Sequence, residues 1–255
     1  MKTVDVISIA NKLGRILLRS GAETSRAESM IMLVCKRFGL DAQCFVSMTG
    51  IITSVTTKDG NIISSVEKVK SISNNLNRID RIHELVLNIE YYDFEEFSSI
   101  LDEIEFEQVY SEPFIILSYF CGAGCFSLLF KGGIIDFIIA GIGGLLVYFV
   151  TKMSNKLKLN NFFINTFCGF LSTTFATIMY NIGIIKTPSY ASIGTIMLLV
   201  PGLALTNAIR DLVNGDLISG VSRAVESFLI GTALGIGTGF SLFLLNFGGW
   251  LNWIT

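Results

Sequence analysis

Hydrophobic positions in the first forty residues recur at the spacing of amphipathic helices. Residues 3–19 carry apolar side chains every three or four positions and basic side chains opposite them, which predicts a helix. Ser20 and Glu23 match a capping box, in which each side chain bonds a free backbone N–H at the start of the next helix. That second helix is predicted to run to about Phe38 and to stop at Gly39.

A switch to extended structure follows. Residues 44–57 are rich in Val, Ile, Thr and Phe, a composition that favours a strand. The Lys-Asp-Gly-Asn sequence at 58–61 predicts a hairpin turn, and residues 62–69 a returning strand. Helical spacing resumes over 75–107. The predicted order of elements is therefore helix, helix, strand, strand, helix, helix, a small α+β domain.

Beyond Pro113 the pattern loses its polar positions. Crossing the hydrocarbon core takes roughly 20 apolar residues per helix, and five runs are near or above that length: 114–130, 133–151, 162–185, 189–209 and 217–246. We therefore predict an α-helical polytopic membrane protein, with a small N-terminal α+β cytoplasmic domain (residues 1–112) and a transmembrane bundle of about five helices (residues 113–255).

Charge supports this division. Residues 1–112 hold 12 of the 19 Lys and Arg and 17 of the 21 Asp and Glu, which leaves 11 charges for the last 143 residues. A soluble fold of that size exposes far more charge, whereas hydrocarbon excludes it. A net charge of −2 gives no basic footprint for nucleic acid. The five cysteines are scattered and form no metal-ligand pattern, so we expect no metal and no cofactor.

Basic residues also predict the orientation in the membrane. With the N-terminus in the cytoplasm, the inner loops carry five basic residues, whereas the outer loops carry only Lys131 and Lys186. This is a positive-inside distribution. We expect a multi-pass protein of the inner (plasma) membrane with its N-terminus in the cytoplasm and its C-terminus outside. The inner-loop residues are Lys152, Lys156, Lys158, Arg210 and Arg223.

Polar residues inside the apolar half are the candidates for function. Asp136 lies near the start of the second run, where an acid either faces a cavity or stabilises the positive end of the helix dipole. Pro201-Gly202 interrupts the fourth run, because proline removes a backbone donor and glycine weakens the turn. Broken helices commonly line substrate sites in transporters, although the same pair also produces a plain kink.

Charged residues cluster after that break. Asn207, Arg210 and Asp211 recur at helical spacing and share one face. Arg223 and Glu226 follow at the start of the last run. A substrate gate and an inner-loop cluster of salt bridges account for these charges equally well. In the N-terminal domain, Glu23, Arg26 and Glu28 are explained by capping and surface ion pairs.

These motifs, in this order, resemble the first half of the threonine/serine exporter family. The resemblance rests on Ser-Gly-Ala-Glu-Thr-Ser-Arg-Ala-Glu at 20–28, Gly-Gly-Ile-Ile-Asp at 132–136, and the stretch from Val200 to Asp216. It covers nearly the whole chain. The family motif marks Gly21, Glu23, Arg26, Glu28, Asp136, Pro201, Gly202, Asn207, Arg210, Asp211, Asp216, Arg223 and Glu226.

The resemblance implies an exporter of small hydrophilic metabolites, driven by the ion gradient, with amino acids or dicarboxylates such as succinate as substrates. Single-chain members carry a second hydrophobic half, and split members place it in a separate protein. The resemblance therefore implies a small second membrane subunit as partner, and an oligomer.

Three hypotheses follow. In the preferred one the chain is a secondary-transport subunit: the broken run forms the midplane site, Asp136 or Glu226 takes a coupling proton, and Arg210 or Arg223 neutralises a substrate carboxylate. In the second, the chain is a membrane-anchored sensor or scaffold that binds a metabolite and moves nothing. In the third, the N-terminal domain is a hydrolase with Glu23, Arg26 and Glu28 in one pocket.

Overall fold

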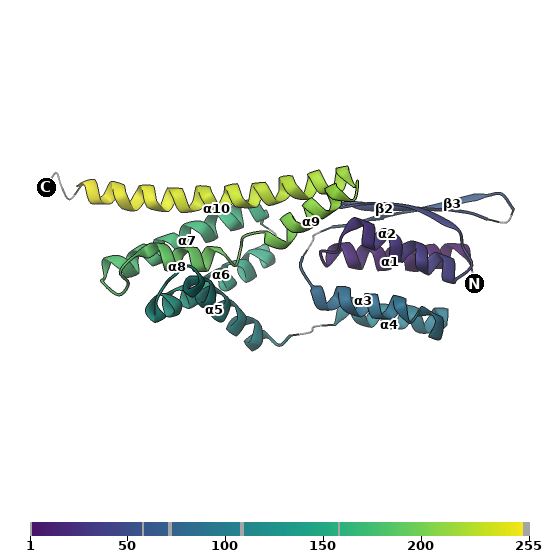
Figure 1. The fold of residues 1–255 in the computed structure, drawn as a ribbon, viewed down its shortest axis with the longest axis horizontal. Coiled ribbons are helices and arrows are strands. Elements are labelled where there is room, and N and C mark those ends of the chain that lie inside the picture. The colour runs from purple at the N-terminus through teal and green to yellow at the C-terminus, as the bar shows by residue number, and fades with distance from the viewer. Residues whose placement is uncertain (1, 58, 71–72, 108–109, 158, 252–255) are drawn as a thin grey trace. The chain divides into compact units, whose positions relative to one another are not determined.

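Two compact units make up the chain (Figure 1). The computed structural model describes residues 2–57, 59–70, 73–107, 110–157 and 159–251. The first unit comprises residues 1–109 and 203–225, and the second comprises residues 110–202 and 226–255. Helix α10 (Leu217–Leu251) contributes residues to both units.

Along the chain, the first unit begins with two helices, continues with three antiparallel strands and then returns to helices. Helices α1 and α2 lie between the sheet on one side and α3 and α4 on the other (Figure 1). The elements are α1 (Thr3–Arg19), α2 (Thr24–Arg37), β1 (Ala42–Ser47), β2 (Gly50–Thr56), β3 (Ile62–Lys68), α3 (Leu76–Leu87), the 3₁₀ helix η1 (Ile89–Tyr91), α4 (Phe94–Phe106) and α9 (Gly202–Val213), which begins one residue before the unit boundary.

The sheet differs from the prediction by one strand. Residues 44–57, expected as a single strand, form β1 and β2, which pair directly from Ser47 and Gly50 through a two-residue connection. Strand β3 then pairs with β2, so the order is β1-β2-β3. The connection, Met48-Thr49, carries none of the Asn-Gly or Asp-Gly signals that mark tight hairpins, so the pattern gave no sign of the turn.

The connection between α1 and α2 also differs from the prediction. Ser20 caps no helix: its side chain is fully buried, and within the described residues its hydroxyl has no hydrogen-bond partner. The chain instead reverses at Gly21, whose φ of 88° is a conformation that glycine adopts at little cost. A Cβ there would lie 2.8 Å from Asn74 Oδ1, so both backbone angle and space require glycine.

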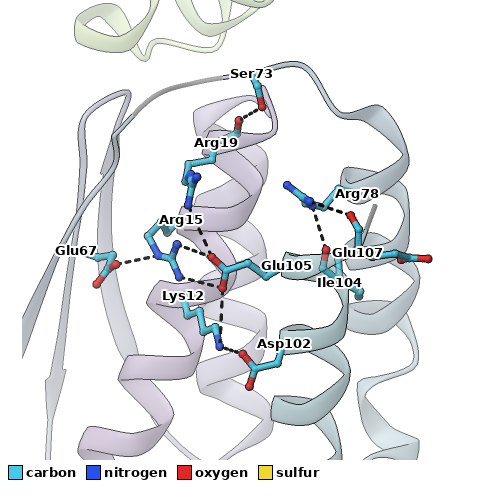
Figure 2. Close-up of polar contacts among 10 residues, drawn as sticks. All are labelled: Lys12, Arg15, Arg19, Glu67, Ser73, Arg78, Asp102, Ile104, Glu105 and Glu107. Atoms are coloured by element: carbon cyan, nitrogen blue, oxygen red, sulfur yellow. Dashed lines mark hydrogen bonds and ion pairs between the residues drawn. The ribbon is translucent and has the colours of Figure 1, made fainter. Parts of the chain in front are cut away.

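An ion network fastens α4 to its neighbours (Figure 2). Glu105 on α4 accepts two hydrogen bonds from Arg15 on α1, at 2.7 and 3.2 Å, and its side chain is only 13% exposed. Arg15 also pairs with Glu67 on β3 at 2.9 Å. Bonding to Glu105 outweighs burial and raises the pKa of Arg15. Arg78 on α3 donates to the carbonyl of Ile104 at 3.1 Å, which satisfies the end of α4.

The second unit is helical. Among the described residues, four helices are long and apolar enough to cross a membrane, with candidate spans at Glu112–Leu129, Ile134–Ser154, Asn161–Asn181 and Leu217–Leu245. They belong to α5 (Glu112–Leu129), α6 (Ile134–Leu157), α7 (Asn161–Asn181) and α10. The unit also contains the short helix α8 (Pro188–Ile196).

The expected count of about five complete spans is not confirmed. The run 189–209 is divided between α8 and α9, of 9 and 12 residues, by non-helical residues 197–201. Both pieces are shorter than the roughly 20 residues that cross the hydrocarbon core. Proline at position 201 has no backbone N–H to donate, which explains why one helix does not continue into the next.

Candidate functional site

The α1–α2 turn, residues 21–24, is bound by side chains of α9 and of the first turns of α10. Asn207 Nδ2 donates to the carbonyl of Gly21 at 2.9 Å, and an Arg223 guanidinium nitrogen donates to the carbonyl of Ala22 at 3.1 Å. We call this contact the turn site. It lies within the first unit, and these two hydrogen bonds join residues that are 186 and 201 positions apart in the sequence.

A tight corner between α9 and α10 positions these side chains. Gly215 has a φ of 92°, and the next amide, Asp216 N–H, donates to the carbonyl of Asp211 at 2.9 Å. A Cβ at Gly220 would lie 2.6 Å from Leu212, so the two helices pack closely just beyond the turn. The corner therefore brings the buried face of α9 and the first turns of α10 into contact with the same segment, the α1–α2 turn.

A buried ion pair lies at the centre of the turn site. Arg223 Nε lies 3.3 Å from Asp211 Oδ2, with side chains 3% and 0% exposed. The Thr24 hydroxyl is 3.1 Å from both Asp211 Oδ1 and Asp216 Oδ2, and its single proton serves one of them at a time. Burial raises the pKa of Asp211, opposed by Arg223 and Thr24. Removing these two charges from water costs free energy, and their contacts with each other and with their neighbours offset that cost.

A second ion pair lies at the exposed edge of the turn site. Arg210 pairs with Glu23, and Arg26 Nη2 lies 3.8 Å from the same carboxylate oxygen. The Glu23 side chain is only 14% exposed, whereas that of Arg210 is 51% exposed. One carboxylate thus faces two cations, and solvent reaches Arg210, unlike the buried Arg223.

Glu28 stands one turn further along α2, half-buried. Burial, and then the negative charge of Asp216, raise the pKa of its carboxyl. Glu28 and Asp216 therefore add negative charge beside the Asp211–Arg223 pair. Among the described residues, no group of three or more His, Cys, Asp or Glu side chains is arranged to hold a metal ion.

The remaining predicted residues lie in or at the edge of the second unit. Asp136 is in the first turn of α6, where its Oδ2 accepts from the Gly133 amide at 2.8 Å. Pro201 ends the break between α8 and α9, where the Gly202 amide donates to the Val200 carbonyl at 2.8 Å. Glu226 is exposed on α10.

Comparison with known proteins places the chain in a family. The model of the threonine/serine exporters matches residues 8–245, which include the turn site, the break and Asp136. This chain belongs to the threonine/serine exporter family.

Three relatives of this exporter-family chain are similar along most of its length. It is 24% identical to a protein of Klebsiella aerogenes named "Probable succinate transporter subunit YjjP", over 92% of each chain. It is 22% identical to the protein of the same name in Escherichia coli, over 96% of this chain and 97% of the other. It is 26% identical to the "Threonine/serine exporter" of Corynebacterium glutamicum, over 93% of this chain but only 51% of that protein. No solved structure matches it significantly.

The structure thus groups most of the predicted site residues of this exporter-family protein. Thr24, which bonds two carboxylates, was not predicted as a site residue, although it lies inside the motif at 20–28. A hydroxyl at the start of a helix is usually explained by local capping, so the sequence does not indicate a partner that is distant along the chain. The turn site brings together Gly21, Glu23, Asn207, Arg210, Asp211, Asp216 and Arg223, with Arg26 and Glu28 beside it.

Proposed function

We propose that the chain is a subunit of a secondary transporter that exports small hydrophilic metabolites across the inner membrane, driven by an ion gradient. The substrate class is an amino acid such as threonine or serine, or a dicarboxylate such as succinate. The observation that carries the proposal is the family match over 238 consecutive residues, 8–245, which include the polar clusters of both units. The names of the three relatives support the same class.

The two arginines of the turn site take different roles in this proposal. Arg223 is buried against Asp211 and the Ala22 carbonyl, so it holds the α1–α2 turn against the corner of α9 and α10. Arg210 is half exposed, and its partner Glu23 also faces Arg26. A substrate carboxylate therefore replaces Glu23 on Arg210 without leaving Glu23 unpaired, since charge-assisted pairs exchange readily at an exposed position.

The break at Pro201-Gly202 supplies the polar backbone of the path. In transporters, interrupted helices place carbonyls and helix ends at the level of the substrate. The boundary between the two units also falls beside the break, after Gly202. We propose that this segment lies on the path and that Asp136 or Glu226 takes the coupling ion. The N-terminus lies in the cytoplasm and the C-terminus outside, as the basic residues predict.

We further propose that a second, small membrane subunit completes the path and that the complex is oligomeric. Two relatives are named as subunits, and the exporter of Corynebacterium glutamicum is about twice as long as the segment that this chain matches. A sensor or scaffold that binds a metabolite without moving it is the alternative, and transport measurements separate the two.

A charge swap tests the role of Arg210. In cells that contain the partner subunit, Arg210→Ala is expected to lower efflux of the substrate at least tenfold, since a bond to a charged group contributes about 1.5–3 kcal/mol. The double variant Glu23→Arg, Arg210→Glu restores the pair but removes the cation from α9. If Arg210 meets substrate, the swap stays inactive. Full efflux from the swap would show that the pair is only structural.

Two further variants complete the experiment. Pro201→Ala allows the helix to continue through the break, so we expect it to lower efflux. The variant protein should still insert into the membrane. Lys36→Ala, which removes an exposed cation on α2, is the matched control and should leave efflux unchanged. Wild-type efflux from both Pro201→Ala and Arg210→Ala would remove the proposed path.

A further inference from the structure

A short turn joins α5 to α6 in the second unit and brings Ser127 close to Asp136. Ser127 lies in the last turn of α5, and its carbonyl accepts from the Gly132 amide at 2.9 Å. Asp136 lies in the first turn of α6. A Cβ at Gly132 would stand 2.6 Å from Ser127 Oγ and 3.1 Å from Asp136 Cβ, so the two side chains flank the same glycine.

Both side chains leave a polar atom unsatisfied. The Ser127 side chain is fully buried, and within the described residues its Oγ has no hydrogen-bond partner. Asp136 uses Oδ2 to accept from the Gly133 amide, and its buried Oδ1 likewise has no partner among the described residues. Capping of α6 explains Oδ2 alone. Burying a polar group without a hydrogen bond costs free energy, so two such atoms on side chains that flank the same glycine indicate that something binds there.

Helix α8 packs directly against α5 beside Ser127. A Cβ at Gly194 would lie 2.8 Å from Ser127 Cβ and 2.7 Å from the carbonyl of Ala123, so these two helices are in direct backbone contact. Any larger side chain at Gly194 would separate them. Ser127 is therefore packed against α8, and its hydroxyl lies beside Gly132 in the turn between α5 and α6.

The donor set identifies the class of ligand. It consists of one carboxylate oxygen, one hydroxyl oxygen and the nearby carbonyl of Ser127, all of which are hard oxygen donors that suit hard cations. A single carboxylate balances one positive charge. We propose that Ser127 and Asp136 form a binding site for a small monovalent cation, either Na⁺ or a hydrated proton.

This site binds the coupling ion of the transporter, and in that respect the inference rests on the proposed function. Tyr148 and Lys152, near the other end of α6, both contact Glu112, the first residue of α5. The two helices are antiparallel neighbours, so Asp136 lies at the opposite end from Lys152. Under the positive-inside rule, the Lys152 end is cytoplasmic and the cation site lies toward the outside. An exporter driven by ion influx loads its ion on that side.

Infrared spectroscopy tests the site independently of transport. The purified whole chain is titrated with acid in Na⁺-free buffer, and separately with NaCl at fixed alkaline pH, while the bands of the Asp136 carboxyl are followed. A response to NaCl identifies Na⁺. Because every carboxyl group responds to acid, the proton is identified only by an acid response whose midpoint Ser127→Ala shifts. Asp136→Asn removes the response. Ser127→Ala is expected to raise the half-saturating cation concentration at least tenfold, because it removes one ligand of a charged group.

Ser118→Ala is the matched control. Ser118 lies on the same helix, but it is exposed and its hydroxyl bonds the Phe114 carbonyl, so its removal should leave the titration unchanged. If Ser127→Ala gives the wild-type response both to acid and to NaCl, the proposal is overturned. Ser127→Ala keeps the test valid even if Asp136→Asn fails to insert.

Transport assays then separate this inference from the function on which it rests. In vesicles that hold the chain and its partner, exchange of labelled for unlabelled substrate needs no ion gradient, whereas accumulation does. Asp136→Asn is expected to lower accumulation far more than it lowers exchange. Loss of both, with normal insertion, contradicts a role confined to the cation. Absence of exchange in the wild type contradicts the proposed function, and the infrared titration then still decides whether the site exists.

Discussion

Replacing Asp211 with alanine should open the turn site. The substitution leaves Arg223, 2% exposed, without the carboxylate beside it, and it removes an acceptor of the Thr24 hydroxyl. Breaking a buried ion pair by removing one partner costs about 3–5 kcal/mol. Because every 1.4 kcal/mol is a factor of ten, the α1–α2 turn should open about a hundredfold to several thousandfold more often.

Hydrogen exchange measures this opening directly. The amides of α2 next to the turn should exchange faster by that factor in the whole protein, in detergent or lipid. Glu103→Ala is the control, because Glu103 is 68% exposed and lies 3.6 Å from Arg81, and exposed pairs contribute about 0–1 kcal/mol. The double variant Asp211→Leu, Arg223→Met should recover most of the loss, since apolar replacements of buried pairs are often neutral.

The reasoning would be refuted by a small effect. If Asp211→Ala changes exchange near the turn no more than Glu103→Ala does, the pair does not hold the turn. If the double variant is no better than Asp211→Ala, the loss comes from packing and not from an uncompensated charge.

Two other substitutions test packing and protonation, each by unfolding measurements on the whole protein. Gly237→Ala should destabilise the second unit by about 1–3 kcal/mol, because its Cβ would lie 2.0 Å from the Thr166 carbonyl oxygen. Gly239→Ala is the control: its Cβ would meet nothing within 4 Å, so it should be neutral or stabilising. Equal effects of the two substitutions on stability would contradict the close approach of α7 and α10. Glu28→Gln should stabilise the first unit at pH 7: a raised pKa means that the folded state holds its proton more tightly, so stability is lost as pH rises from the ordinary value of 4.5 through the raised one. The gain should vanish below about pH 4, where the carboxyl is protonated in both states, and a gain that is the same at pH 4 and pH 7 would exclude a charge effect.

The helices of both units could be predicted from periodicity because most of them bury one face or lie in lipid. What the pattern could not show were features that depend on a distant partner. Ser20 and Glu23 matched a capping box, yet Ser20 is buried and Glu23 pairs with Arg210 on α9. A local motif competes with tertiary contacts for the same side chains, and here the tertiary contacts prevail. Met48-Thr49 forms a hairpin connection although neither residue is a typical turn signal.

The candidate site shows the same division. The motif around 20–28 and the one around 207–223 were identified separately, but spacing along the chain gave no reason to bring them together. Their contact depends on the corner at Gly215. Ser127 was not predicted at all, since a serine in an apolar helix usually bonds a carbonyl of its own helix. What distinguishes it is that its hydroxyl, close to Asp136, has no hydrogen-bond partner in the part of the chain that the structure describes.

Transport by purified components tests the central claim most directly. The chain is reconstituted into lipid vesicles with the second subunit, with either one alone, or with neither, and uptake of labelled threonine, serine and succinate is measured under an imposed ion gradient. We predict gradient-dependent accumulation of at least one of the three, and only when both subunits are present. Uptake no greater than in protein-free vesicles for all three, or equal uptake with the second subunit alone, would contradict the account.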